Sequence, residues 1–239
     1  MSKLPLLGLV DYGSGNLRSV QRAIEHAGAE CVHVLGEADT AGCAALVVPG
    51  VGSFGDCARQ LREAGLWEVI KGWIAADKPY LGICLGYQLL FDSSEESPGV
   101  EGLGALRGKV IHFPKSSGLK IPHMGWNQLH IRQSSDRLMK GLGENPDFYF
   151  VHSYYPAPED EKIITSTCDY GVEFAARREI AGSRKCGFGG GARPSWPPGR
   201  LRAIRPVENR RRAACPRSPG SGARRPPAPG HSGSASGNR

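Results

Sequence analysis

The chain has 239 residues, 40% of them hydrophobic, which suffices for one domain of ordinary size or for one domain with an appendage. Its formal charge of +7 combines two unlike parts, because residues 1–176 hold 15 Lys and Arg against 21 Asp and Glu, whereas residues 177–239 hold 15 against 2. The first part therefore excludes a broad basic surface for nucleic acid, and no segment approaches the roughly 20 apolar residues that cross a bilayer.

The first 90 residues alternate short apolar runs with amphipathic stretches, a pattern typical of the βαβ units of a mostly parallel sheet. The apolar runs, bounded by Gly, Pro or Asp, predict strands at residues 6–10, 31–35, 44–48 and 79–84. Apolar residues at helical spacing predict a helix from residue 17 to 27, a second long helix from 61 to 73, and a third over 85–90.

Beyond residue 100 the sequence is richer in antiparallel signals. Strands are predicted at residues 104–110, 126–131 and 148–152, and a hairpin joins residues 163–168 to 172–175. From Arg177 the pattern ends, since the last 63 residues carry 9 of the 18 prolines and 11 of the 33 glycines. Such a segment buries too little surface to offset its chain entropy. We expect an α/β domain over residues 1–176 and a disordered basic tail over residues 177–239.

The junction of the fourth predicted strand and the third helix carries the sequence Gly82-Ile83-Cys84-Leu85-Gly86. G-x-C-x-G between a strand and a helix is the cysteine form of the nucleophile elbow. This turn holds the nucleophile in a strained conformation and aims the N–H of Leu85 at a developing oxyanion, and the helix N-terminus is expected to lower the thiol pKa. A second donor is expected from the loop Gly50-Val51-Gly52. The alternative is a buried structural cysteine.

Several motifs, in order and spacing, resemble the glutamine amidotransferase subunit family of imidazole glycerol phosphate synthase, which is of the class I, triad type. The resemblance spans residues 6 to about 176. It rests on the segments Asp11–Asn16, Pro49–Gly52, Gly82–Leu90, Ser94–Glu96, Pro122–Asn127 and Phe150–Tyr154.

The resemblance implies a flavodoxin-like, mostly parallel sheet flanked by helices, with the last strand and helix missing. It also implies a glutaminase that passes ammonia to a separate (β/α)8 cyclase subunit, which makes imidazole glycerol phosphate and AICAR in histidine biosynthesis. By this likeness Cys84 forms the glutamyl thioester and the N–H groups of Gly52 and Leu85 hold the oxyanion. The segment Pro122–Asn127 would lie toward the partner subunit. The residues implied to hold the amino-acid end of glutamine are Gln88, Glu96, Ser153 and Tyr154.

One family feature is absent from this sequence. Members carry His-Pro-Glu near the C-terminus, which supplies the general base and the carboxylate that orients it, and this chain has no His-Pro-Glu. His231, the only histidine after residue 152, lies in a Gly- and Ser-rich segment that cannot hold its ring. The tail has 14 Arg and 1 Lys, which suggests that the reading frame shifts shortly after Ala176. Without this base, glutamine turnover by the chain is expected to fall by orders of magnitude.

Other readings of the sequence remain as alternatives. The chain could bind its cyclase partner without supplying ammonia, or its Arg-rich tail could contact nucleic acid. Gly13-x-Gly15 lacks the third glycine of a dinucleotide loop, and His123 and His152 are weak candidates for the base. Seven cysteines without a C-x-x-C pair favour a reducing compartment, so we expect a cytoplasmic, membrane-free protein that uses no metal or other cofactor.

Overall fold

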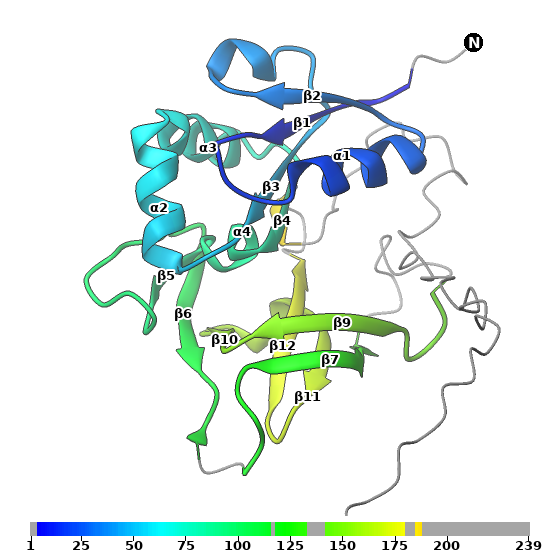
Figure 1. The fold of residues 1–239 in the computed structure, drawn as a ribbon, viewed down its shortest axis with the longest axis vertical. Coiled ribbons are helices and arrows are strands. Elements are labelled where there is room, and N and C mark those ends of the chain that lie inside the picture. Colours follow the sequence, from blue (N-terminus) through cyan, green and yellow to red (C-terminus); the bar gives the residue numbers. More distant parts are fainter. Residues whose placement is uncertain (1–3, 116–117, 133–141, 180–184, 188–239) are drawn as a thin grey trace, which may run out of the picture. The chain divides into compact units, whose positions relative to one another are not determined.

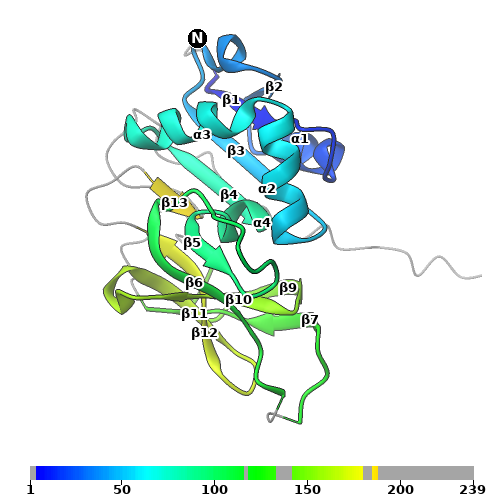
Figure 2. The ribbon, with the colours of Figure 1, turned by 90° about the vertical axis from the view of Figure 1, so that its left-hand side faces the viewer.

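The computed structural model describes residues 4–115, 118–132, 142–179 and 185–187, all within the first of two structural units, Met1–Pro206 (Figures 1 and 2). The disordered tail was predicted to begin at residue 177, but residues 177–179 and 185–187 lie in strands; the rest of the predicted tail, residues 180–184 and 188–239, lies outside the described residues. Within the described part, no helix is both long and apolar enough to cross a membrane.

An eight-stranded sheet runs in the order β2-β1-β3-β4-β13-β12-β11-β8. The pairs from β2 to β13 are parallel, and those from β13 to β8 are antiparallel. The predicted strands of the first half are confirmed, as is the hairpin of β11 and β12. The strands are β2 (Glu30–Val34), β1 (Leu6–Val10), β3 (Ala45–Gly50), β4 (Tyr80–Cys84), β13 (Lys185–Gly187), β12 (Glu173–Glu179), β11 (Ile164–Asp169) and β8 (His130–Ile131).

Helices cover both faces of the parallel strands. Helix α1 (Leu17–His26) lies on one face, and α2 (Phe54–Glu63) and α3 (Leu66–Ala75) lie on the other (Figure 2). Strand residues alternate between two buried clusters, as the period of two requires. Leu9 and Val47 pack with Ile24 of α1, whereas Val10, Leu46 and Val48 join the cluster of α2 and α3.

The prediction of one long helix over residues 61–73 is wrong. Two helices occur, because Gly65 adopts a left-handed conformation with φ of 70° between them. Helix α2 also begins before the predicted segment, where the Ser53 hydroxyl accepts a hydrogen bond from the N–H of Asp56. The apolar spacing continues through Gly65, so periodicity alone does not reveal the break.

Two smaller sheets complete the described part. One has the order β10-β6-β5 and the other pairs β7 with β9. The predicted strand over residues 126–131 is in fact two strands in different sheets, β7 and β8. The helix after Cys84 ends at Gln88 rather than Leu90, and β5 and β10 are unpredicted. The elements are α4 (Leu85–Gln88), β5 (Phe91–Ser94), β6 (Leu106–His112), β7 (His123–Gln128), β9 (Asp147–His152), β10 (Tyr154–Pro158) and the 3-10 helices Glu37–Thr40 and Glu161–Ile163.

Strand β13 lies beside β4 in the middle of the main sheet. Its backbone pairs with Tyr80 and Leu81, whereas Gly82, Ile83 and Cys84 have no ladder partner on that side among the described residues. The resemblance implies that the last family strand is missing, and a missing strand would expose apolar residues of β1 and β4. Leu7, Leu9 and Val10 are nevertheless buried, and Leu81 and Ile83 are half-buried. Among the described residues, the C-terminal end of β4, which carries Cys84, is therefore paired on one side only, with β3.

Candidate active site

Cys84 occupies a tight turn between β4 and α4. Its φ of 56° and ψ of −115° are rare for a residue with a side chain, as expected of a nucleophile elbow. Two glycines permit the turn to pack closely. A Cβ on Gly82 would lie 2.5 Å from the carbonyl oxygen of Gly86, and a Cβ on Gly86 would overlap the carbonyl oxygen of Val48. The elbow therefore lies directly against β3.

Two buried tyrosines hold the segments on either side of the elbow. The hydroxyl of Tyr80 donates to the carbonyl oxygen of Gly86 at 2.7 Å, and that of Tyr12 donates to the carbonyl oxygen of Pro49 at 3.0 Å. Pro49 and Gly86 flank the two loops predicted to supply the oxyanion donors. The sequence did not reveal these contacts, because Tyr12 and Pro49 are 37 residues apart and nothing in their spacing predicts the pair.

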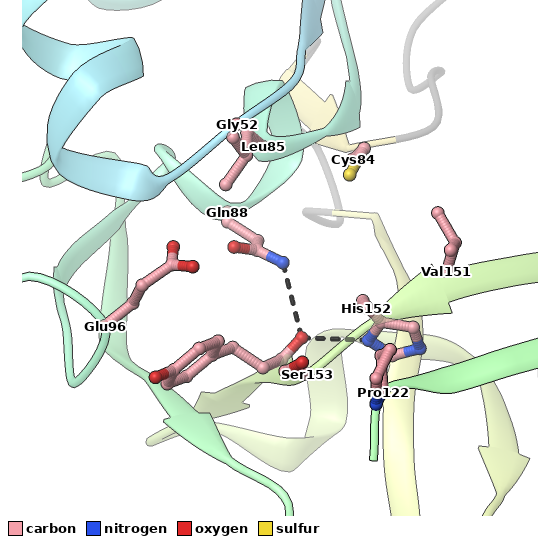
Figure 3. A pocket seen from close by; sticks show the side chains of 10 residues that line it. Gly52, Cys84, Leu85, Gln88, Glu96, Pro122, Val151, His152 and Ser153 are labelled. Carbon is pink, nitrogen blue, oxygen red and sulfur yellow. Dashed lines mark hydrogen bonds between the residues drawn. The ribbon is translucent and has the colours of Figure 1, made fainter.

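A pocket of about 220 Å³ opens in front of the Cys84 thiol. All seven residues predicted for the site line it, and the structure adds Pro122, Val151 and His152 (Figure 3). Pockets for drug-sized ligands span about 300–1,000 Å³, so this one suits a molecule of amino-acid size. The predicted residues are Gly52, Cys84, Leu85, Gln88, Glu96, Ser153 and Tyr154.

The environment of the Cys84 thiol differs from the expectation. The residue is exposed to the pocket, but protein packed behind it removes hydration, and this desolvation raises the pKa of the thiol. The N–H of Leu85 lowers the pKa by less, and the charge of Glu96 raises it further. The predicted net lowering is therefore wrong, since the four-residue helix α4 contributes little dipole and no described histidine hydrogen-bonds to the sulfur.

This pKa predicts how labelling of Cys84 depends on pH. Only the thiolate attacks an electrophile, so the alkylation rate should keep rising with pH beyond the ordinary thiol value of about 8.5. Iodoacetamide labelling followed by peptide mass spectrometry measures this. N-Acetylcysteine, whose thiol pKa is ordinary, serves as the comparison, because burial also raises the pKa of Cys31. A rate at Cys84 that levels off below pH 8 would contradict the raised pKa.

Gln88 and Glu96 reach the pocket with part of their hydrogen-bonding capacity used. The Nε2 of Gln88 donates to the carbonyl oxygen of Tyr154 at 3.3 Å, and its Oε1 is buried without a partner among the described residues. The Oε2 of Glu96 accepts from the N–H of Phe54 at 2.7 Å, which satisfies the first turn of α2. Glu96 therefore keeps its other oxygen for a ligand, whereas the Oε1 of Gln88 is itself covered by the surrounding protein.

His152 lines the pocket, but both its ring nitrogens are engaged. Its Nδ1 lies 2.8 Å from the carbonyl oxygen of Tyr154, and its Nε2 lies 3.2 Å from Nδ1 of His123. Neither nitrogen is free to take a proton from Cys84, so these contacts argue against His152 and His123 as the base. Among the described residues, no group of three His, Cys, Asp or Glu side chains could hold a metal ion.

Comparisons with known proteins agree with this geometry. The family model described as "Glutamine amidotransferase class-I" matches residues 8–183. The chain is 44% identical over 171 residues to "Imidazole glycerol phosphate synthase subunit HisH" of Rhodopirellula baltica, covering 72% of this chain and 82% of that protein. It is 47% identical over 178 residues to the protein of the same name from Aquifex aeolicus, with the same coverage.

Solved structures share the fold. A structure titled "Crystal structure of glutamine amidotransferase" superposes with a TM-score of 0.53 at 20% identity, over 67% of this chain and 78% of that one. "Structure of PurLQS from Thermotoga maritima" gives a TM-score of 0.54 at 23% identity, over 72% and 77%. The expected α/β amidotransferase fold is thus confirmed. The chain belongs to the class-I glutamine amidotransferase family and, within it, to the HisH-type subunits.

Proposed function

We propose that this chain hydrolyses glutamine to glutamate and ammonia, and that the ammonia passes to a (β/α)8 cyclase subunit of imidazole glycerol phosphate synthase in histidine biosynthesis. The observation that carries the proposal is the pocket itself. Seven residues, predicted from motifs up to 102 positions apart, line one cavity of amino-acid size in front of a strained cysteine. A cysteine that served only to pack the core would not be expected to line such a cavity.

In the proposed reaction the Cys84 sulfur attacks the side-chain carbonyl carbon of glutamine. The carbonyl electrons move to oxygen, where the N–H groups of Leu85 and Gly52 would donate hydrogen bonds. The tetrahedral intermediate collapses by breaking the C–N bond, and the nitrogen takes up a proton and leaves as ammonia. Water then hydrolyses the thioester and releases glutamate and the thiolate.

The amino-acid end of glutamine would be held on the opposite side of the pocket. Glu96 presents an oxygen that suits an α-ammonium group, and Gln88, Ser153 and Tyr154 line the same cavity. A chloroketone analogue of glutamine tests the assignment, because the Cys84 sulfur displaces its chloride to form a stable thioether. We expect modification at Cys84, protection by glutamine, and loss of labelling in Cys84→Ser but not in Cys31→Ser. Glutamine that fails to protect would contradict the proposal.

The β7–β9 ribbon offers a surface for the partner. Met124 opposes Val151 and Trp126 opposes Tyr149 across the two strands, and all four side chains are between 53% and 61% exposed. Clustered exposed apolar residues mark interaction surfaces. Val151 also lines the pocket, so this face adjoins the proposed site of ammonia release. We assign the surface to the cyclase subunit.

Replacing Trp126 should weaken this association. A buried tryptophan anchor contributes about 2 kcal/mol or more, so Trp126→Ala should raise the dissociation constant at least about 30-fold. Calorimetric titration with the cyclase subunit measures the change. Leu35→Ala, at a side chain 66% exposed on the loop after β2, is the matched control and should bind normally. Equal weakening by both variants would locate the interface elsewhere.

A second function is favoured by the missing His-Pro-Glu sequence. The chain would dock on the cyclase and alter it without supplying ammonia. A pull-down with the cyclase, combined with an ammonia assay on the same complex, separates the two functions.

We place either function in the cytoplasm, where the unpaired thiols of Cys31, Cys43, Cys57, Cys84 and Cys168 stay reduced. A nucleic-acid role of the tail concerns mainly residues outside the described part.

A further inference from the structure

The segment that follows β5 is docked on the first turn of α2. Two successive backbone N–H groups of the helix donate to two successive residues of this segment. The N–H of Phe54 donates to Oε2 of Glu96 at 2.7 Å. The N–H of Gly55 donates to the hydroxyl oxygen of Ser97 at 2.9 Å. N–H groups of a first helical turn have no acceptor within the helix, so both are satisfied by the segment. The segment is therefore attached to α2 at two points.

Gly55 provides the space in which helix and segment meet. A Cβ added at residue 55 would lie 2.8 Å from Oγ and 3.1 Å from Cβ of Ser97, and 3.6 Å from a methyl group of Val100. The Ser97 hydroxyl could escape the first contact only by leaving the N–H of Gly55. The second contact would still press the segment away from the helix. A side chain at residue 55 thus breaks one of the two attachments.

A movement of Ser97 reaches Glu96, because both belong to one compact turn. The N–H of Ser97 donates to the carbonyl oxygen of Ser94 at 3.2 Å, and the N–H of Glu96 donates to the Ser94 hydroxyl at 3.2 Å. The N–H of Val100 donates to the carbonyl oxygen of Ser97 at 3.1 Å. Ser94 itself is buried at the end of β5. The backbone of Glu96 is therefore held between the end of β5 and the attachment at Ser97.

Glu96 carries this placement into the pocket. Its side chain lines the cavity in front of Cys84 while Oε2 accepts from Phe54 (Figure 3). The charge of Glu96 also raises the pKa of the Cys84 thiol, as expected of a carboxylate that faces the same cavity. A carboxylate held by one hydrogen bond alone has more orientations available than one whose backbone is also fixed. The direction of its second oxygen thus depends on the contact between Gly55 and Ser97.

We propose that Gly55 and Ser97 are positioning residues that aim the second carboxylate oxygen of Glu96 at the α-ammonium group of the substrate. The inference rests on the proposed glutamine pocket and adds two residues that do not line it. Their contribution is selectivity for an amino acid over the same molecule without its amino group. A hydrogen bond between charged groups is strong and depends on alignment, so a shift of Glu96 weakens this contact in particular.

Two chloroketones measure this selectivity, one that carries the α-ammonium group of glutamine and one that lacks it. In both reactions the Cys84 sulfur displaces chloride and forms a thioether. The ratio of the two second-order labelling rates therefore cancels changes in the reactivity of the thiol. We expect the ratio to fall about tenfold in Gly55→Ala and about threefold in Ser97→Ala. The second change is smaller because it removes the acceptor without pressing the segment away.

Matched substitutions that spare the contact should keep the ratio within about twofold of the parent. Ser97→Thr retains the hydroxyl acceptor. Gly72→Ala makes the same change of residue type as Gly55→Ala, at an exposed helical position where an added Cβ has no atom within 4 Å. A fall in either control as large as in its partner variant overturns the inference, because the effect would then not depend on the contact between Gly55 and Ser97.

Glu96→Gln separates the inference from the pocket on which it rests, because it removes the charge but keeps an oxygen for the N–H of Phe54. This variant should lower the ratio about tenfold. If it does so while Gly55→Ala and Ser97→Ala keep the parental ratio, the inference is overturned and the pocket stands. A parental ratio in Glu96→Gln contradicts the role of Glu96 in the pocket and, with it, the inference. Ser97→Ala decides alone if circular dichroism shows that Gly55→Ala does not fold.

Discussion

Ammonia release from glutamine by this chain is expected to be about 10²–10⁴-fold slower than by a HisH-type relative that carries His-Pro-Glu. Two features of the site set this expectation. The pKa of the Cys84 thiol is raised, so little thiolate is present at neutral pH, and both nitrogens of His152 are committed to other groups. The pocket, the strained elbow and the two residues proposed to donate to the oxyanion are present, so the expected loss is confined to proton transfer. A coupled glutamate dehydrogenase assay, with the cyclase subunit added, measures the rate.

Adding imidazole to the buffer tests whether the missing general base is the cause of the slow turnover. A small base that enters the pocket should take the thiol proton and return it to the leaving ammonia, so turnover should rise in proportion to the imidazole concentration. Cys84→Ser should show no such rise. Rates equal to those of the relative without imidazole would contradict the expectation, and rates unaffected by imidazole would show that the deficiency is not a missing base.

The parallel half of the fold could be predicted because its strands are continuously apolar and bounded by turn residues, as in Leu6–Val10 and Tyr80–Cys84. Strand β5 escaped prediction because Asp92-Ser93-Ser94 is polar, and β10 because prolines at 156 and 158 argue against a strand. Both belong to the small sheet, where tertiary pairing with β6 overrides local preference.

The candidate site, like the fold, has one part that could be predicted from the sequence and one part that could not. Cys84 and the residues around it could be predicted from linear motifs, since the chemistry of an elbow requires a particular local sequence. The contacts of Phe54 with Glu96 and of Gly55 with Ser97 could not. Each joins residues 42 positions apart and depends on how the segment after β5 packs on α2, which leaves no signal in sequence spacing.

Gly86→Ala is expected to destabilise the protein by about 3 kcal/mol, the largest effect of any methyl group added near the site. In an ordinary helix the same change stabilises by up to about 1 kcal/mol, because alanine loses less chain entropy than glycine. Here the added Cβ would overlap the carbonyl oxygen of Val48, so α4 must move away from β3 or Cys84 must leave its strained turn.

Gly72→Ala is the matched control, because Gly72 lies exposed in α3 with no atom within 4 Å of an added Cβ. Urea unfolding should therefore show opposite signs for the two variants. If Gly86→Ala unfolded at the same urea concentration as the parent, the elbow would not pack against β3 as described, and the close approach that positions Leu85 at the pocket would lose its basis.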